Sequence, residues 1–208
     1  MHARKWRCAV ERADLTELHY ICHMNNLPSI LANGILSHRH AQRHHPTRIA
    51  NEDVQGRRAR TTVPGGRPLH DYVNLYLNAR NPMLYRVTDG GNDVEHLCVL
   101  SVSTQVLDHD DVVLTDGNAA SGPTAFRSVS SGLAAIERQR VFAQNWNHAD
   151  PLEKREHRRV MCAEILVPRS VDAAMISGVY VASDRIAASV SASVANVRAI
   201  VKESLFFR

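Results

Sequence analysis

Short strand-like segments recur along the chain, and their distribution constrains the fold more than any other feature. No internal repeat and no linker separates the first of them from the last within the 208 residues. This spread favours one domain over 1–208, of the α+β class, with a mainly antiparallel or mixed sheet. The expected strands are 18–22, 71–77, 96–103, 110–117, 160–168 and 173–183, and the expected helices are 26–34, 131–142 and 184–200.

Polar segments separate these elements. Residues 38–67 and 144–159 carry many His, Arg and other polar residues with little periodicity, so long loops are expected there, with one short helix near 51–59. The first helix has clear boundary signals, because Asn26 is a suitable N-cap, Pro28 suits a first turn and Gly34 suits a stop.

Charge and hydropathy narrow the function classes only slightly. The net charge of +4 and the pI of about 9.1 permit a nucleic-acid partner without requiring one. Basic residues gather at 57–60 and 154–159. No apolar run approaches the roughly 20 residues of a membrane span, and segment 1–15 lacks the apolar core of a signal peptide. A cytoplasmic protein without a membrane partner is therefore expected.

Several kinds of chemistry lack their usual signatures. His38, His40, His44 and His45 lie close together, but no carboxylate or paired Cys stands at metal-ligand spacing, so no metal is expected. The chain also lacks a Gly-rich phosphate loop and a G-x-S-x-G nucleophile motif. The four cysteines are widely spaced and are expected to be buried free thiols: Cys8, Cys22, Cys98 and Cys162.

Glu164 is the residue that stands out, because it interrupts the apolar run "VMCAEILVP" at 160–168. On an edge strand it would simply face solvent. At the mouth of a cleft, a strand-borne carboxylate can orient a hydroxyl group or stabilise a developing cation. The residue pattern alone leaves both alternatives open.

Four segments together resemble one family, the DarT-type DNA ADP-ribosyltransferase toxins. They occur in the family's order and are spread over most of the chain, and the part of the second that reads "LHDYVNLYLNARNPMLY" is the most specific. The four segments are "HYICHMNNLPSILANGILS" (19–37), "VQGRRARTTVPGGRPLHDYVNLYLNARNPMLY" (54–85), "DGNAAS" (116–121) and "RRVMCAEILVP" (158–168).

The resemblance implies a fold and a reaction. The fold would be a single ADP-ribosyltransferase-like domain, with a split mixed β-sheet and flanking helices that clamp NAD in a cleft. The enzyme would transfer ADP-ribose from NAD to a base in single-stranded DNA and release nicotinamide, without a metal. Its partner would be a cognate antitoxin that removes the mark, an ADP-ribosyl-DNA hydrolase of the macrodomain type or similar.

The resemblance also assigns roles to residues. Glu164 falls on the catalytic glutamate, where its carboxylate would hold the ribose 2′-hydroxyl and stabilise an oxocarbenium-like cation. Arg57 and Arg58 compete for the essential arginine, with Arg57 favoured. The first-strand motif falls on Tyr20 and Cys22 instead of the family's usual His-x-Thr, with His19 one place earlier. Further NAD contacts are expected from Asn26, Ser29, Ser37, Tyr72, Tyr76 and Met83.

DNA contacts are expected from the segment before the glutamate. Residues 117–163 carry an aromatic and several cations that suit stacked bases and phosphates. The residues assigned to DNA are Arg80, Trp146, Lys154, Arg155, Arg158 and Arg159. The segments 19–38 and 73–84 resemble the guanine-modifying branch of the family more than its thymine-modifying branch, which implies guanine as the modified base.

Two rival functions stay open at this stage. An ADP-ribosyltransferase on the same scaffold can act on RNA or protein, although Cys162 stands where arginine-modifying relatives often carry Glu. A nucleic-acid-binding module with an inactive site is the other alternative, and consumption of NAD separates it from an enzyme.

Overall fold

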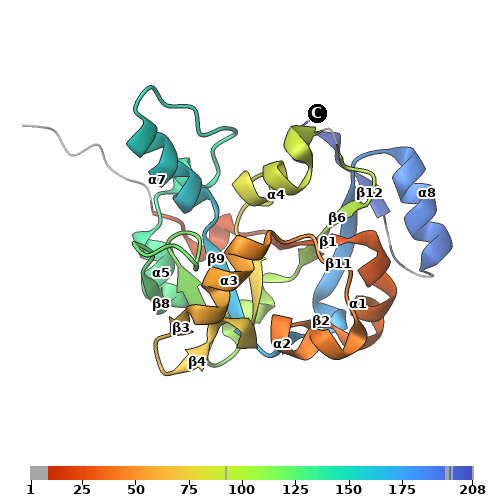
Figure 1. Ribbon diagram of the computed structural model, residues 1–208, viewed down its shortest axis with the longest axis horizontal. Helices are drawn as coiled ribbons and strands as arrows, with labels where there is room; N and C mark the ends of the chain where they lie inside the picture. Colours follow the sequence, from red (N-terminus) through yellow and green to blue (C-terminus); the bar gives the residue numbers. More distant parts are fainter. Residues whose placement is uncertain (1–8, 92, 195–196, 198, 208) are drawn as a thin grey trace, which may run out of the picture.

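A computed structural model describes residues 9–91, 93–194, 197 and 199–207. These residues form an eight-stranded sheet in the order β12-β11-β6-β1-β5-β9-β7-β8. Neighbours are antiparallel except β11 and β12, so the sheet is mixed, as expected. Helices α1 and α8 lie at the β12 end, and α5 and α7 lie toward the β8 end (Figure 1). The strands are β1 Leu18–His23, β2 Ile35–Leu36, β3 Thr62–Val63, β4 Arg67–Pro68, β5 Tyr72–Tyr76, β6 Leu97–Val102, β7 Val113–Thr115, β8 Phe126–Ser128, β9 Glu164–Pro168, β10 Ser170–Val171, β11 Ile176–Val181 and β12 Ala199–Val201.

The α-helices are short and cover both ends of the sheet. Each expected helix corresponds to at least one of them. They are α1 Leu27–Asn33, α2 His38–Ala41, α3 Glu52–Arg60, α4 Pro82–Val87, α5 Val129–Ala135, α6 Arg138–Val141, α7 Pro151–Met161 and α8 Asp184–Ser193.

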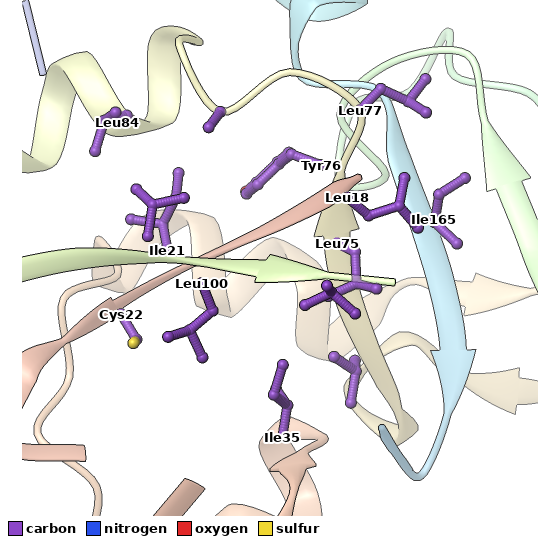
Figure 2. Packing of buried hydrophobic residues seen from close by; sticks show 14 of the residues in the cluster. Leu18, Ile21, Cys22, Ile35, Leu75, Tyr76, Leu77, Leu84, Leu100 and Ile165 are labelled. Atoms are coloured by element: carbon purple, nitrogen blue, oxygen red, sulfur yellow. The ribbon is translucent and has the colours of Figure 1, made fainter. Parts of the chain in front are cut away.

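The sheet is split in its middle, between β1 and β5. These strands share one residue pair, His19 with Tyr76, whereas β1 pairs with β6 over six positions from Leu18 to His23. Figure 2 shows Leu18 and Tyr76 near the point where the two strands meet, with Cys22 toward the far end of β1. Because β1 and β5 diverge from that point, their backbones leave room for a cleft between the two halves of the sheet.

Large apolar side chains from both halves fill the core beside the split. Leu18, Leu75, Leu100 and Ile165 come from four neighbouring strands and are fully buried (Figure 2). Burial of such a side chain stabilises the fold by roughly 1.5–3 kcal/mol. The core therefore holds the two half-sheets together although only one residue pair joins their strands.

The helix expected at 131–142 is broken in two. Ile136 is extended (φ −89°, ψ 129°) between α5 and α6. Its carbonyl accepts a hydrogen bond from the N–H of Val10 at 3.2 Å, and Glu137 bridges to Ala9. Pairing with the N-terminal segment replaces the helical hydrogen bonds at this point, which local sequence does not reveal.

The predictions of a polar loop at 144–159 and of a strand from residue 160 are wrong in part. Residues 151–161 form α7, whose N-cap Asp150 accepts a bond from the N–H of Leu152, with Pro151 in the first turn. The strand β9 begins only at Glu164. The many charged residues of 154–159 suggested a solvated loop, but this segment belongs to a helix whose buried side carries His157, Val160 and Met161.

Two further expectations differ in extent. The loop at 38–67 contains α2, α3 and the β3–β4 hairpin, with α3 close to the short helix expected at 51–59. The helix expected at 184–200 ends at Ser193, and β12 follows at 199–201; residues 195, 196 and 198 lie outside the described residues. Cys8 also lies outside them, whereas Cys22, Cys98 and Cys162 are buried free thiols as expected. In the described part of the chain, no helix has the length and apolarity needed to cross a bilayer.

Gly34 gives a direct test of how α1 is joined to β2. Its φ is +79°, and a Cβ there would lie 2.3 Å from the carbonyl oxygen of Val171 on β10. Gly34→Ala should lower the free energy of unfolding by roughly 1–3 kcal/mol from backbone strain alone, measured by urea denaturation. Gly122→Ala is the control, because a Cβ at Gly122 meets no atom within 4 Å. Equal stabilities of the two variants would contradict this description of the joint.

Candidate active site

A cavity of about 1190 Å³ lies at the split of the sheet. Its walls come from β1 and β5, from helices α3, α4 and α7, and from the loop at 118–123 (Figure 1). The volume is somewhat above the roughly 300–1,000 Å³ of small-molecule and cofactor sites. The divergence of β1 from β5 thus accompanies a cavity that is large enough to hold a substrate.

A buried ion pair lies against this cavity. Nη1 of Arg58 on α3 donates to both carboxylate oxygens of Glu164 on β9, at 3.1 and 3.0 Å. The side chains are 8% and 0% exposed. The N–H of Ala119 donates to Oε1 of Glu164 at 2.9 Å. The carboxylate thus has charged and neutral donors in place of water, which offsets the desolvation cost of burying it.

The ion pair bears on two points that the sequence left open. Glu164 does not stand at the mouth of the cleft, because Arg58 lines the cavity and the carboxylate lies behind it. Arg57 was favoured as the essential arginine, but its side chain is exposed at the cavity wall and Arg58 makes the contact with Glu164. Successive helical residues point about 100° apart, so only one of the two can face the glutamate.

Arg159 holds the loop that covers Glu164. Its guanidinium donates to Asp116 Oδ1 at 2.8 Å, to Thr124 Oγ1 at 3.1 Å and to both oxygens of Glu156 at 2.7 and 2.9 Å. The bond to Glu156 raises the pKa of Arg159 and lowers the pKa of Glu156. The arginine expected to bind DNA is therefore occupied in a clamp between α7 and the loop. We call Asp116, Thr124, Glu156 and Arg159 the Arg159 clamp.

Six of the residues assigned to NAD line the cavity. Burial raises the pKa of the Tyr20 and Tyr76 hydroxyls, the latter also through the nearby Glu164, so both stay neutral. Burial likewise raises the pKa of Cys162 to about 12, which makes this cavity-lining thiol a poor nucleophile. The six residues are Tyr20, Cys22, Asn26, Tyr72, Tyr76 and Met83.

Asn26 shows how one of these residues is placed. It occupies the N-cap position of α1 as expected, but its side chain does not cap the helix. The side-chain amide instead pairs with the backbone of Thr47, donating to the carbonyl and accepting from the N–H at 2.9 Å each. Asn26 thereby fastens the 46–51 segment, which forms part of the cavity wall.

His19, Ser29 and Ser37 are outside the cavity lining. Side chains alternate along a strand, so His19 faces away from Tyr20 and Cys22 and contacts Glu17 at 3.3 Å. Burial raises the pKa of Glu17, but bonds from His19, Ser101 and Tyr180 outweigh it and hold the pKa at about 2. Ser37 is fully buried and contacts His40 Nδ1 at 2.8 Å.

The residues assigned to DNA divide into two groups. Arg155 and Arg158 on α7 line the cavity together with Arg159, whereas Lys154 is exposed and outside its lining. Arg80 donates to the carbonyl of Ser204 at 2.6 Å, and its guanidinium lies 4.0 Å from the ring centroid of Phe207. Trp146 contacts Tyr85 and Phe207 edge-to-face outside the cavity lining.

Sequence reasoning missed a stacked histidine pair and a backbone donor. His38 and His70 line the cavity with ring centroids 4.0 Å apart, and His70 contacts Gln55 Oε1 at 3.1 Å. Burial, and then the proximity of His38 and Arg58, lowers the pKa of His70 to about 4. The dense histidines at 38–45 were the available signal. The sequence gives no signal for the role of the Ala119 N–H, because any residue except Pro supplies a backbone donor.

The other histidines of segment 38–45 were considered for a metal site, and the structure tests that possibility. Among the residues that the structure describes, no group of three His, Cys, Asp or Glu side chains is placed to hold a metal ion.

The mixed sheet, split in its middle with a cavity at the split, agrees with the ADP-ribosyltransferase-like fold that the resemblance implies. A family model described as "DarT: ssDNA thymidine ADP-ribosyltransferase, DarT" matches residues 19–207. The chain therefore belongs to the DarT family.

Two similar proteins, one of them in two solved structures, accompany this match. A DNA ADP-ribosyl transferase–DNA ADP-ribosyl glycohydrolase fusion protein of Thermosipho africanus is 32% identical over 197 residues; the match covers 92% of this chain and 49% of the fusion protein, so the chain spans about half of that relative. Thermus sp. 2.9 DarT in complex with ADP-ribosylated ssDNA has a TM-score of 0.79 at 27% identity, covering 96% and 99% of the two chains. The same Thermus protein in complex with NAD⁺ has a TM-score of 0.72 at 25% identity, covering 93% and 98%.

The ion pair makes a prediction about stability. Arg58→Ala leaves the Glu164 carboxylate buried without its charged partner, so the free energy of unfolding should fall by about 3–5 kcal/mol. Arg57→Ala removes an exposed neighbour and should change it by less than about 0.5 kcal/mol. Denaturant unfolding of both variants measures the difference. A more destabilised Arg57 variant would contradict the assignment of Arg58.

The stacked histidines make a prediction about pH. His70 has a pKa of about 4 in the folded protein against 6.5 as its ordinary value. The unfolded chain therefore binds the proton more readily, and the stability that neutral His70 confers is lost as pH falls from 6.5 to 4. His70→Gln should reduce the slope of unfolding free energy against pH in this window. Other histidines also titrate there, so the quantity to compare is the difference between the two proteins; unchanged slopes would exclude His70.

Proposed function

We propose that this protein transfers ADP-ribose from NAD to a base in single-stranded DNA and releases nicotinamide. Membership of the DarT family supports this reaction, as do the ADP-ribosylated DNA and NAD⁺ held by the Thermus relative. The observation that carries the proposal is the Arg58–Glu164 pair behind the wall of a cavity of about 1190 Å³. The cavity has the size for a dinucleotide, and the pair supplies the charges that glycosyl transfer requires.

The chemistry needs a stabilised cation and a positioned arginine. The bond between the ribose C1′ and the nicotinamide nitrogen breaks, its electron pair leaves with nicotinamide, and the ribose becomes oxocarbenium-like. The Glu164 carboxylate stabilises that charge and holds the 2′-hydroxyl. Arg58 contacts the substrate from the cavity wall. Its guanidinium does not deprotonate in proteins, so its role is electrostatic. The base bonds to C1′ through a nitrogen and loses the proton of that nitrogen to water.

Substrate binding must first uncover the carboxylate. Glu164 is 0% exposed beneath Arg58 and Ala119. Catalytic hydrogen bonds often form only in the substrate complex. We infer that NAD displaces the Arg58 or Ala119 contact and takes its place with the ribose 2′-hydroxyl, while the other contact continues to fix the carboxylate.

The proposal also specifies the modified base and the partner protein. The resemblance of segments 19–38 and 73–84 supports guanine as the modified base, whereas the family model is described by thymidine. The glycohydrolase half of the Thermosipho fusion protein supports an antitoxin that removes ADP-ribose from DNA. The protein would then be the toxin of a toxin–antitoxin pair.

Mass spectrometry of short single-stranded oligonucleotides tests the reaction. Four oligonucleotides, each with one candidate base in a neutral context, are incubated with the protein and NAD. We expect an added ADP-ribose on the guanine oligonucleotide and at least a roughly 100-fold loss of rate for Glu164→Gln. Glu11→Gln is the matched control, since Glu11 is exposed and outside the cavity lining.

Each other outcome contradicts a different part of the proposal. An adduct on thymine alone would overturn the choice of guanine and leave the reaction standing. Loss of NAD without any DNA adduct would redirect the target to RNA or protein. No loss of NAD would favour a binding module.

A further inference from the structure

Two exposed apolar side chains lie on helices that contribute to the cavity wall. Among the described residues, two large hydrophobic side chains are exposed: Tyr85, at 43%, and Leu152, at 73%. Tyr85 is on α4 and Leu152 on α7, the two helices that contribute to one side of the cavity wall (Figure 1). Isolated exposed apolar residues are common, but two beside one cavity indicate a surface for a ligand.

Tyr85 belongs to an aromatic cluster built from three distant parts of the chain. Its ring centroid lies 5.4 Å from that of Trp146 and 5.1 Å from that of Phe207, and Trp146 and Phe207 are 5.9 Å apart. All three contacts are edge-to-face, which holds the rings rigidly. We name Tyr85, Trp146 and Phe207 the aromatic cluster. All three rings keep part of their surface accessible.

The charge around the aromatic cluster is positive and uncompensated. Arg86 follows Tyr85 on α4, while Arg155 and Arg158 project from α7, and all three line the cavity. The Arg158 guanidinium carbon lies 6.0 Å from the Trp146 ring centroid. Within the described parts of the chain, no carboxylate forms an ion pair with any of these three arginines, in contrast to the fully occupied Arg159. Uncompensated cations next to open aromatic surface suit a ligand that has both phosphates and flat rings.

We propose that the aromatic cluster is a stacking site for a nucleobase next to the one that is modified. The modified base would enter the cavity toward Arg58, and the neighbouring base would stack on the open surface of Tyr85 and Trp146. The intervening phosphate would contact Arg155 or Arg158. This inference rests on the proposed function, because it takes the strand in the cavity to be single-stranded DNA. Stacking on an aromatic ring tolerates every base, so this site contributes affinity and not sequence preference.

The test combines removal of an aromatic ring from the protein with removal of a base from the DNA. DNA affinity is measured by fluorescence anisotropy at fixed salt and without NAD, using an oligonucleotide and a series with one abasic site at each position flanking the target. Trp146→Ala should weaken binding of the intact oligonucleotide roughly tenfold. At one flanking position, the abasic oligonucleotide should bind the variant and the unaltered protein equally. Tyr85→Phe keeps the ring and should bind normally, whereas Tyr85→Ala should resemble Trp146→Ala.

Trp146 also supplies a direct signal. The chain has two tryptophans, so Trp6→Phe leaves Trp146 as the sole indole. Single-stranded DNA should quench the emission of Trp146. The abasic oligonucleotide that binds the variant and the unaltered protein equally should quench it less.

The outcomes separate this inference from the proposed function. Normal adduct formation with no coupling at any position, or unchanged Trp146 emission, would overturn the stacking site and leave the reaction intact. Coupling without any adduct would support the stacking site and contradict the reaction. If Trp146→Ala does not fold, as judged by circular dichroism, the Tyr85→Ala and Tyr85→Phe pair decides.

Discussion

The buried ion pair between Arg58 and Glu164 is the interaction on which the site depends. It joins α3 to the start of β9, 106 positions apart in sequence, with two contacts of 3.0 and 3.1 Å. A carboxylate without solvent contact is stable only when charged and neutral donors replace water. The 38–67 region thus holds one arginine against one glutamate, and Arg58 forms part of the cavity wall.

The split sheet explains why the cavity is there. The single pair between β1 and β5 fixes one end of the two strands, and their divergence opens the other end toward α3 and α4. Apolar side chains from both halves still form one continuous core, so the opening does not divide the hydrophobic centre. The position of the cavity is thus a consequence of strand pairing, while its chemical character depends on the side chains that line it.

Sequence reasoning predicted the strands better than the site geometry. Apolar runs such as 96–103 permitted only a buried strand, and the mixed α+β class followed from them. By contrast, 154–159 reads as a solvated run because most of its charges face outward or lie in the Arg159 clamp. The choice between Arg57 and Arg58 depends on helical phase. The complete burial of Glu164 depends on a loop 45 positions away, which the apolar neighbours do not reveal.

The Arg159 clamp separates what can vary in this site from what cannot. It fixes the path of the 116–124 segment through Asp116 and Thr124, and a Cβ at Gly117 would lie 2.2 Å from the Arg159 guanidinium. Between these fixed points, residues 120–123 line the cavity, and Ala119 acts on Glu164 through its backbone alone. Substitutions at 120–123 can therefore change the lining of the cavity while the contacts of Glu164 with Arg58 and Ala119 stay unchanged.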